Sequence, residues 1–500
     1  MKPKGANHRS AVRAAPRRVP GEVLVQFTPE ASSFHVVSAH RSMGAKVIDR
    51  LDKVNCQVVK VPPGREGRYV ARYARHRLVR YAEPNYLVHA LYLPNDPYLN
   101  GTYETSHDGA MSQYWLHKIS APDAWDRVRT LGPGAVVAIV DTGIDHEHPD
   151  LSSKMFRDAA GKVIGHNFIT GTDDAMDDNG HGTHCAGIAA AATNNGVGVA
   201  GVSFNAVRLM PVKVLDGSGS GSVANVAAGI TWASDHGAKV ISLSLGSSMY
   251  SQTLQEAILH ARSEGAIVVA AAGNDGRAVC NYPGANFHVL GVAATGQDDM
   301  CADFSNWNIG VGLGAPGVNI LSTTPDRPCE LNNYGYLQNY DSMDGTSMAT
   351  PVVSGLMALL LAAEPGITPE DAIGRLQATA RNVAGTTGDG WDVHYGYGRV
   401  DAKAVLDATP RGSGLGCVYG QVVNKSGLPV LGVQVSAGGR SYRTGADGMF
   451  RLANLPAGKY DVVVRKGLRW NCWTANKTVA LASVEVKPGQ DTMARLTAWP

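Results

Sequence analysis

Residues 344–361 decide the fold: Asp344-Gly345-Thr346-Ser347-Met348-Ala349-Thr350-Pro351, followed by the apolar run Val352-Val353-Ser354-Gly355-Leu356-Met357-Ala358-Leu359-Leu360-Leu361. We interpret this stretch as a tight turn at Gly345 that opens a buried helix. Ser347 is expected at or near the first helical position, because hydroxyl residues suit a helix start. Pro351 falls early enough in the helix to be tolerated. A hydroxyl at a helix N-terminus lies among unpaired N–H groups, where an oxyanion would be stabilised. Taken alone, the stretch is equally compatible with a serine that only caps a core helix.

The length and composition of the chain favour a multidomain globular protein. Its 500 residues suggest about three domains. A hydrophobic content of 44%, together with 58 glycines, indicates a compact, loop-rich chain with a large core. Because no run of about 20 apolar residues occurs, we expect no membrane span.

The formal charge is distributed unevenly along the chain. Residues 1–90 carry 17 Lys and Arg against 6 Asp and Glu, and residues 411–500 carry 12 against 4. The stretch between them carries 16 against 33. An acidic middle between basic flanks indicates cation binding in the middle and attraction between the segments, and it argues against nucleic-acid binding. We interpret residues 1–20 as a solvated basic tail, because no aromatic residues interleave with its charges.

The seven cysteines favour disulfides over a zinc site. They lie at positions 56, 185, 280, 301, 329, 417 and 472, and none forms a CxxC pair. Cys417 can pair with Cys472. Cys280 can pair with either Cys301 or Cys329. Such pairing favours an oxidising compartment, so we expect a secreted protein, although residues 1–20 lack the apolar core of a signal peptide.

Residues 21–91 follow the tail as a segment of their own. They alternate like strands at 22–27 and 56–61, with helix-like segments at 33–43 and 67–77. This pattern predicts a small α+β domain, and nothing in it has the residues of a catalytic site.

Residues 92–410 alternate strands with helices. Ala135–Val140 is a near-continuous apolar run, typical of a strand buried on both faces of a parallel sheet. Further strands are expected at 209–215, 239–245, 266–272 and 289–294. Helices are expected at 182–192, 223–236, 253–264, 350–363 and 369–379. The order predicts a doubly wound, mostly parallel α/β domain, whose functional residues gather at the carboxyl ends of strands, where Asp141 and Asn274 stand.

A linker at 409–414 leads into a third segment, residues 415–500, with short alternating strands between turn signals. The strands are expected at 418–423, 434–436, 449–452, 460–464, 479–486 and 492–496. This composition predicts a small antiparallel β-sandwich.

Three residues could support nucleophilic catalysis by serine, which needs a base for the hydroxyl proton and an anion that orients the base. Asp141 stands at a strand end, His181 lies between two glycines before a helix of small residues, and Ser347 begins a helix. Asp, His, Ser is one of the chain orders in which such triads occur. Two alternatives compete. His181 and His184 are spaced as a metal pair, without a third ligand nearby, and Cys185 is a possible thiol nucleophile, although its helix of Ala and Ile indicates a buried thiol.

Three motifs resemble the signatures of the subtilisin-like serine proteases, and most closely those of the thermitase and proteinase K branch. They are Asp141-Thr142-Gly143, Gly180-His181-Gly182-Thr183-His184 followed by Cys185, and Gly345-Thr346-Ser347-Met348-Ala349. The resemblance, which spans about residues 92–408, implies that Asp141 orients His181, the general base and acid. It implies that Ser347 attacks the peptide carbonyl, and that the Asn274 amide and the Ser347 N–H hold the oxyanion. A catalytically dead homologue is the alternative, against which the presence of all four residues argues.

By the same resemblance, four segments form the substrate cleft. Ser244-Leu245-Gly246 and Ala271-Ala272-Gly273 are the implied walls of the primary specificity pocket, Asn281-Tyr282-Pro283-Gly284 its base, and Gly219-Ser220-Gly221 the edge that pairs with substrate backbone. Small walls without a buried charge imply a roomy apolar pocket and a broad preference for aromatic or large aliphatic side chains. Backbone pairing adds affinity without much selectivity.

The loop at 193–199 resembles the tight calcium site of the family. The implied ligands are the carbonyls of Thr193, Val197 and Val199, the side chain of Asn195, and the carboxylates of Asp150 and Asp96. Such a mixed set of oxygen ligands suits Ca²⁺. The alternative is an ordinary turn beside two surface aspartates. A further acidic loop forms either a second site or a solvated surface: Asp173, Asp174, Asp177 and Asp178.

The flanking segments complete the resemblance. Residues 21–90 resemble the family's inhibitory propeptide, with self-cleavage expected between Val88 and Leu93. Residues 415–500 resemble the carboxypeptidase regulatory-like, transthyretin-like fold, for which adhesion, a folding role and removal on maturation are all open. The resemblance therefore implies a secreted, calcium-stabilised endopeptidase, made as a self-processing zymogen and acting as a monomer on protein and peptide substrates. The rival is a non-catalytic adhesion protein whose active part is the sandwich.

Two positions depart from the family pattern. Pro351-Val352-Val353 stands where the family has Pro-His-Val, which puts one supporting contact in doubt. Asp344 stands where an uncharged residue is common, which predicts a shifted pH profile.

Overall fold

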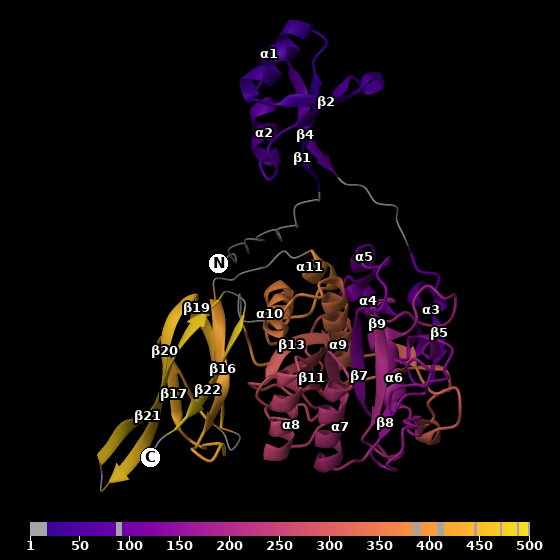
Figure 1. The fold of residues 1–500 in the computed structure, drawn as a ribbon, viewed down its shortest axis with the longest axis vertical. Coiled ribbons are helices and arrows are strands. Elements are labelled where there is room, and N and C mark those ends of the chain that lie inside the picture. Colours follow the sequence, from indigo (N-terminus) through magenta and orange to yellow (C-terminus); the bar gives the residue numbers. More distant parts are fainter. Residues whose placement is uncertain are drawn as a thin grey trace, which may run out of the picture. The chain divides into compact units, whose positions relative to one another are not determined.

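Figure 1 shows the computed structural model, which describes residues 18–86, 93–383, 391–407, 415–444, 448–470, 473–487 and 490–498. The chain divides into two compact units, Met1–Tyr92 and Leu93–Pro500. Each unit is described by itself.

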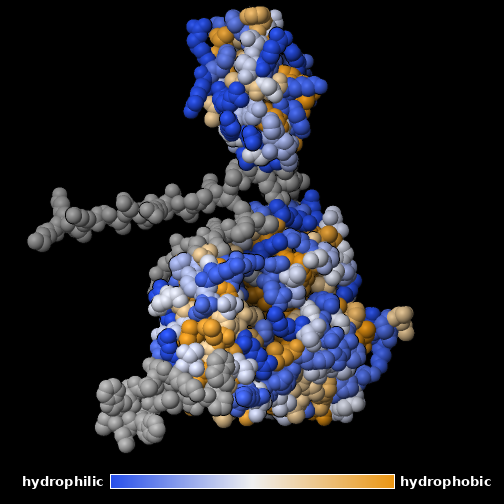
Figure 2. All heavy atoms as spheres, turned by 60° about the vertical axis from the view of Figure 1, so that its left-hand side comes forward, coloured by the Kyte–Doolittle hydropathy of each residue, from blue (hydrophilic) through white to orange (hydrophobic). Residues whose placement is uncertain are grey.

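The first unit is an α+β domain, as its sequence predicts. Its elements are β1 (Arg18–Phe27), α1 (Ser33–Met43), β2 (Lys46–Leu51), a 3₁₀ turn (Asp52–Val54), β3 (Cys56–Lys60), α2 (Glu66–Tyr73) and β4 (Val79–Tyr86). The strands form an antiparallel sheet in the order β2-β3-β1-β4. Alternate residues of β1 are buried, and they form the core with the inner faces of both helices. Strand β2 was not expected, because five of its six residues are exposed and give no apolar alternation. The face of this unit drawn in Figure 2 is largely hydrophilic, with scattered hydrophobic side chains.

The second unit is built on a parallel sheet of seven strands. Their order is β13-β12-β11-β10-β7-β9-β8. Their bounds are β7 (Ala135–Asp141), β8 (His166–Asn167), β9 (Val207–Lys213), β10 (Val240–Leu243), β11 (Ile267–Ala271), β12 (Val289–Thr295) and β13 (Val311–Pro316). Strand β13 was not expected, because Val311-Gly312-Leu313-Gly314 places glycine at every second position and so has a weak strand pattern.

Helices cover both faces of this sheet (Figure 1). They are α6 (His181–Ala190), α7 (Val223–Asp235), α8 (Gln252–Ser263), α9 (Thr346–Ala363) and α10 (Pro369–Thr379). Ala138 and Val140 pack against α7 and α8 on one face. On the other face, the Ser354 hydroxyl of α9 donates a hydrogen bond to that of Ser242 in β10 (2.9 Å). Successive side chains of a strand point to opposite faces, which is why the buried strands are apolar at nearly every position. The doubly wound α/β prediction is confirmed.

Shorter elements surround this core. They are α3 (Pro97–Asn100), α4 (Tyr114–Lys118), α5 (Ala121–Trp125), α11 (Ala402–Leu406), the hairpins β5 (Tyr103–Thr105) with β6 (Gly109–Met111) and β14 (Ile320–Thr323) with β15 (Tyr340–Met343), and 3₁₀ turns at Ser152–Lys154 and Glu330–Tyr334. Within the described part of the chain, α9 is the one helix long and apolar enough to cross a membrane, and 83% of it is buried inside the unit. A core helix needs the same composition.

The C-terminal strands form two packed sheets. One has the order β19-β16-β22 and the other β18-β17-β20-β21. The strands are β16 (Leu415–Val423), β17 (Gln434–Ala437), β18 (Arg440–Arg443), β19 (Met449–Pro456), β20 (Gly458–Trp470), β21 (Trp473–Val486) and β22 (Asp491–Thr497). Valines and other apolar residues from both sheets share one core. The expectation of a purely antiparallel sandwich is wrong at one pair. β16 and β22 run parallel, because the chain crosses from the other sheet before β22 and so needs no hairpin there.

The expected disulfides at Cys280 are not formed. Both of its possible partners, Cys301 and Cys329, carry free thiols. The pairing of Cys417 with Cys472 lies partly outside the described residues, because Cys472 does. The sulfur chemistry of the described residues therefore gives no support to an oxidising compartment.

Candidate active site

A buried carboxylate lies at the end of the central part of the sheet. Asp141 is the last residue of β7 and has no exposed surface. Its Oδ1 accepts the N–H of Thr142 and lies 2.8 Å from Nδ1 of His181, and the Thr142 bond is also 2.8 Å. A fully buried carboxylate is stable only when hydrogen bonds or an opposite charge compensate for the loss of water. The negative charge of Asp141 therefore favours a position of the His181 ring within hydrogen-bonding distance.

Two glycines bring His181 to this carboxylate. His181 is the first residue of α6, and Gly180 before it has φ +116°, a conformation that favours glycine. A Cβ on Gly182 would lie 2.1 Å from the carbonyl oxygen of Gly143. Only glycine therefore lets the start of α6 pack onto the turn after β7, where the Gly182 N–H binds the Thr142 hydroxyl (2.9 Å).

Ser347 is the second residue of α9 and is partly exposed, whereas its neighbours in the helix are buried. Its hydroxyl donates to the carbonyl of Ser244 (3.1 Å). Its own carbonyl accepts the Ser244 hydroxyl (2.7 Å) and the Cys185 thiol (3.5 Å). Cys185 links the two halves of the site, because its sulfur lies within 4.8 Å of the facing atoms of Asp141 and His181. The structure thus pairs Asp141 with His181 directly, and it bonds the Ser347 hydroxyl to Ser244.

The side chain of Asn274 is fixed beside the start of α9. Its Oδ1 accepts both the N–H (2.9 Å) and the hydroxyl (2.8 Å) of Thr346. Because an N–H can only donate, these bonds assign the amide oxygen and leave Nδ2 on the side of Gly345. A hydrogen-bond donor is therefore oriented next to Ser347.

Charge and burial act in opposite directions on His181. Burial disfavours its charged form, but the charge and hydrogen bond of Asp141, with the charge of Asp177 added, outweigh burial and raise the pKa of His181 above its ordinary value. Asp177 is buried and holds the preceding loop through the N–H groups of Asn179 and Gly180 (3.0 and 2.9 Å). The imidazole is thus a stronger base than a free histidine.

The competing assignments for this region do not fit the geometry. Burial lowers the pKa of His184 to about 4, and its Nε2 bonds to the carbonyl of Asp341 (3.1 Å), so His184 does not converge with His181 on a metal. Burial raises the pKa of the Cys185 thiol well above its usual value, which keeps it protonated and a poor nucleophile or metal ligand.

A cavity of about 500 Å³ opens beside His181. Six of the predicted substrate-binding residues line it: Gly219, Ser220, Gly221, Ser244, Leu245 and Gly246. Four others do not: Ala271, Ala272, Gly273 and Asn281. The Asn281 amide instead lies against Gly246 and Gly273, and its Nδ2 donates to the carbonyl of Ala271 (3.3 Å). It occupies the space between the two predicted walls, so the polar side chain of Asn281 fills room that the small walls were expected to leave open.

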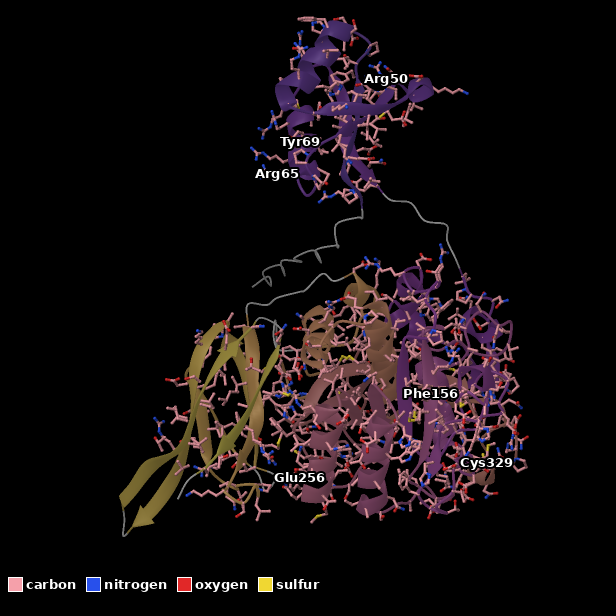
Figure 3. The ribbon with its side chains drawn as sticks, viewed as in Figure 1. Arg50, Arg65, Tyr69, Phe156, Glu256 and Cys329 are labelled. Carbon is pink, nitrogen blue, oxygen red and sulfur yellow. The ribbon has the colours of Figure 1, made fainter. Side chains whose placement is uncertain are left out.

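Sequence reasoning missed several apolar residues of the cavity. They are Leu215, Val223, Val226, Met249, Leu254 and Leu331, whereas Tyr282 and Pro283 line the cavity as the predicted base of the pocket. Leu331 comes from the 3₁₀ turn after Cys329, which Figure 3 labels. The N–H groups of Glu330 and Leu331 bond to the carbonyls of Asp178 and Asn179 (3.0 Å each), and Arg327 pairs with the buried Asp145 (3.4 Å). The turn is therefore held against the loop that carries His181. A Cβ on residue 180 would lie 2.7 Å from the Leu331 side chain, so glycine at this position lets the turn approach the loop.

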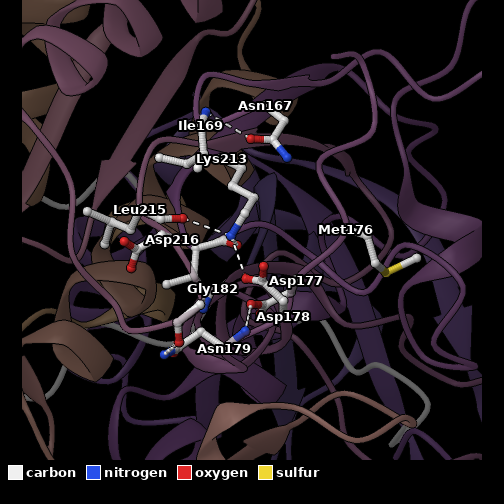
Figure 4. Close-up of polar contacts among 12 residues, drawn as sticks. Asn167, Ile169, Met176, Asp177, Asp178, Asn179, Gly182, Lys213, Leu215 and Asp216 are labelled. Atoms are coloured by element: carbon white, nitrogen blue, oxygen red, sulfur yellow. Dashed lines mark hydrogen bonds and ion pairs between the residues drawn. The ribbon is translucent and has the colours of Figure 1, made fainter. Parts of the chain in front are cut away.

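A buried lysine ties together the loops around the cavity (Figure 4). Lys213 ends β9, and its ammonium donates to the carbonyls of Thr142 (2.7 Å) and Leu215 (2.8 Å). It also pairs with the carboxylate of Asp178 (2.6 Å). One cation thus joins the turn after Asp141, the loop before His181 and the segment that lines the cavity.

The predicted calcium residues gather around one loop. Asp150 is fully buried and accepts hydrogen bonds from Asn195 Nδ2 (2.7 Å) and the Val199 N–H (2.9 Å), and Asp96 accepts from the Asn194 N–H (2.8 Å). Burial raises the pKa of both carboxyls, that of Asp150 to about 6. Among the described residues, neither forms an ion pair with Lys, Arg or His. Two buried acids without a cationic partner fit a divalent metal.

Not every predicted ligand faces this place. Asn195 presents its Nδ2, not its oxygen, to Asp150, and its oxygen accepts the Val197 N–H (3.0 Å). The carbonyl of Thr193 accepts Asn205 Nδ2 (2.7 Å). These two groups would have to turn to bind a metal.

The four aspartates of the acidic loop do not converge. Asp173 pairs with Lys162 (2.7 Å), Asp174 lies 3.4 Å from the His146 ring, Asp177 accepts the Thr183 hydroxyl (2.7 Å), and Asp178 pairs with Lys213. Each carboxylate has its own partner, so the structure gives no second metal site in this loop.

Family models match three segments of the chain. The subtilase family model matches residues 132–398, the fervidolysin N-terminal prodomain model matches residues 5–85, and the carboxypeptidase regulatory-like domain model matches residues 418–497. These are the three segments whose sequences differ in character.

Relatives agree with the family models. The chain is 38% identical over 384 residues to a thermophilic serine proteinase of Bacillus sp. (strain AK1), which covers 77% of this chain and 86% of the relative. It is 43% identical over 316 residues to thermitase of Thermoactinomyces vulgaris, over 63% of this chain and 99% of the relative. Among solved structures, fervidolysin from Fervidobacterium pennivorans, described as a keratinolytic enzyme related to subtilisin, matches with a TM-score of 0.55 and 27% identity. That match covers 96% of this chain and 78% of the other.

The paired Asp141 carboxylate predicts the ionisation of His181. In the Asp141→Asn variant, we expect the pKa of His181 to fall, because burial is then opposed only by the charge of Asp177. NMR titration of the histidine ring signals measures this value. The matched control is Asp235→Asn, which removes a carboxylate 2.6 Å from the exposed His260 and should leave His181 unchanged. An unchanged pKa of His181 in Asp141→Asn would contradict the electrostatic account.

Proposed function

The chain belongs to the subtilase family, as a serine endopeptidase with an N-terminal prodomain, and on that premise we propose that Asp141, His181 and Ser347 form its catalytic triad. The observation that carries the proposal is the 2.8 Å contact between Asp141 and Nδ1 of His181, with Ser347 on the adjacent helix start. The carboxylate fixes the tautomer that leaves Nε2 as the proton acceptor.

The reaction begins with a turn of the Ser347 side chain. Its hydroxyl exchanges the bond to the Ser244 carbonyl for one to Nε2 of His181, by rotation about the Cα–Cβ bond. His181 takes the hydroxyl proton as Ser347 attacks the peptide carbonyl, and it then returns that proton to the leaving amine. Water hydrolyses the acyl-enzyme by the same steps. The raised pKa of His181 supports its role as base.

The oxyanion is held by Nδ2 of Asn274 and the N–H of Ser347. The two hydrogen bonds from Thr346 to Asn274 Oδ1 support this assignment, because they orient the amide before substrate binds. A donor fixed in advance stabilises developing charge without reorganisation.

The cavity supports a preference for large apolar or aromatic side chains with otherwise broad specificity. Its lining includes Leu215, Leu245 and Tyr282, and the Gly219–Gly221 edge is free of bulky side chains. An extended substrate pairs its backbone with this edge, as in strand addition. The substrates are proteins and peptides.

The remaining parts of the proposal concern maturation. The first unit acts as an intramolecular inhibitor that is released by self-cleavage, and the expected cut between Val88 and Leu93 lies within or next to residues 87–92, which are outside the described range. A zymogen keeps a protease inactive until it has left the cytoplasm, so we include secretion in the proposal, with the enzyme acting as a monomer.

Calcium is the proposed structural cofactor. Asp96 and Asp150 would hold it, together with the carbonyls of Val197 and Val199, and with Asn195 and Thr193 once these have turned. Bound Ca²⁺ would supply the positive charge that the two buried carboxylates lack. It stabilises the loop and takes no part in the chemistry.

Removal of the nucleophile tests the function directly. We expect Ser347→Ala to lower casein hydrolysis by about 10⁶, the loss typical of removing one member of a triad, and to block release of the first unit. The matched control is Cys185→Ser, which deletes the thiol alternative and should keep both activities. If Ser347→Ala still cleaved casein, or if only Cys185→Ser abolished cleavage, the triad would be wrong.

The side chain of Leu331 should limit the size of the substrate side chain that lies next to His181 in the cavity. We expect Leu331→Ala to raise kcat/KM severalfold for peptides that are bulky at that position, relative to peptides that are small there, because the cavity widens. A panel of fluorogenic peptides measures the ratio. Leu428→Ala, at an exposed leucine of the C-terminal strands, is the control. An unchanged ratio in Leu331→Ala would exclude Leu331 as a wall of the site.

The raised pKa values of Asp96 and Asp150 predict how stability depends on pH and calcium. Both acids bind protons more tightly folded than unfolded, so the metal-free protein should lose stability as pH rises through about 6. Calcium should restore that stability above pH 6 and have less effect below it. Thermal unfolding with calcium and with chelator measures both effects. Asp150→Asn should abolish the response, whereas Asp173→Asn should keep it. A melting temperature indifferent to chelator at pH 8 would remove the calcium assignment.

A further inference from the structure

One strand of the C-terminal sandwich lies against the part of the sheet domain that forms the cavity. Tyr419 and Gln421 are two apart on β16, so their side chains lie on the same face, and both are almost fully buried. The Tyr419 hydroxyl donates to the carbonyl of Asn286 (3.1 Å). The Gln421 Nε2 donates to the hydroxyl oxygen of Tyr250 (2.9 Å).

Both contacts lead to the wall of the cavity. The ring of Tyr250 packs edge-to-face on that of Tyr282, with centroids 5.5 Å apart, and Tyr282 lines the cavity. The backbone of Tyr282 exchanges two hydrogen bonds with Ser247, another lining residue (2.8 Å each). Asn286 continues the same segment and donates its N–H to the carbonyl of Pro283 (2.8 Å). The sandwich therefore supports the wall from behind.

The hydrogen bonds at Tyr250 run in one direction. Its oxygen accepts from Gln421, and its hydroxyl hydrogen goes to Oε1 of Gln252 (3.0 Å). A hydroxyl group that accepts one hydrogen bond and donates another is polarised by both, so each hydrogen bond strengthens the other. Loss of the Gln421 donor would weaken the position of the Tyr250 ring.

A buried ion pair keeps the sandwich in this place. Arg451 and Asp491 both belong to the sandwich, lie 2.7 Å apart and are nearly inaccessible. The sheet domain completes their hydrogen bonds. The Ile309 carbonyl accepts from Arg451 Nε (2.8 Å), and Tyr397 and Gln377 donate to Asp491 (2.9 and 3.0 Å). A buried ion pair is stable only when its remaining polar atoms are hydrogen-bonded, so these bonds hold the sandwich against the sheet domain.

The geometry points to a role that the proposed protease function leaves open. We infer that the C-terminal sandwich is a lasting part of the substrate cleft, and that Gln421 positions the pocket wall through Tyr250 and Tyr282. The sandwich thus sets how tightly the enzyme holds a large side chain. The inference rests on the proposed function, because it concerns the same cavity. In this role, Gln421 and Tyr250 are positioning residues and do not touch the reacting atoms.

The test removes the hydrogen bond between Gln421 and Tyr250, once from each side. We expect Gln421→Met and Tyr250→Phe to lower kcat/KM about threefold to tenfold for peptides with an aromatic or large aliphatic side chain in the pocket, mainly by raising KM, the loss expected for one buried hydrogen bond. Peptides with alanine there should be hydrolysed as before. Tyr250→Phe also deletes the bond to Gln252, so the double variant should resemble Tyr250→Phe alone, because Gln421→Met removes nothing further.

The matched control is Tyr460→Phe. It also deletes one tyrosine hydrogen bond, to the Pro456 carbonyl (2.8 Å), but within the sandwich and away from the cavity wall. It should keep the wild-type selectivity. If Gln421→Met and Tyr250→Phe hydrolyse all peptides as Tyr460→Phe does, the inference is wrong.

A second readout needs no activity. In full-length Ser347→Ala protein, Gln421→Met and Tyr250→Phe should each speed amide hydrogen exchange in residues 247–250 and 282–286, and Tyr460→Phe should not. Unchanged exchange in both variants would overturn the inference even if catalysis differs. Absence of hydrolysis by the wild type would refute the protease proposal instead. The hydrogen-exchange result would still show whether Gln421 and Tyr250 hold the cavity wall in place.

Discussion

The buried carboxylate of Asp141 is the interaction on which the rest of the site depends. It ends a strand in the middle of a parallel sheet, where water does not reach it, so its charge must be met by groups of the protein. The N–H of Thr142 and the ring of His181 meet it. The His181 ring reaches this carboxylate from the start of α6, where the glycine at position 182 leaves room for the turn after β7.

The cleft around this pair is assembled from distant segments. Lys213 joins three loops through one ammonium group, the turn at Leu331 closes the side next to His181, and β16 of the sandwich supports the opposite wall through Gln421. Lys213 and Gln421 are buried polar supports, and such hydrogen bonds favour one arrangement of the segments that they join. The proposed catalytic residues are therefore held by the end of β7 and the starts of α6 and α9, and the shape of the pocket is held by the surrounding segments.

Much of this could be predicted from the sequence, and the limits have physical reasons. The strand β7 has a near-continuous apolar run, and β9, β10, β11 and β12 are largely apolar, so these strands were predictable. The glycine motifs predicted that Asp141 ends a strand and that His181 and Ser347 stand at helix starts. The contact of Leu331 with the His181 loop was not, because it depends on how an irregular turn folds back. The direction of the Ser347 hydroxyl and the position of the Asn281 amide depend on side-chain rotation, which no pattern encodes. The expected disulfides failed because cysteine spacing does not determine distance.

In the proposed triad, Ser347 attacks the peptide bond after His181 removes its proton. A fluorophosphonate reacts covalently with such an activated serine, and peptide mass mapping locates the label. We expect one label per molecule of the processed enzyme, on Ser347, and a large loss of labelling rate in His181→Ala. A label on Cys185, or labelling of Ser347 that is indifferent to His181→Ala, would contradict it.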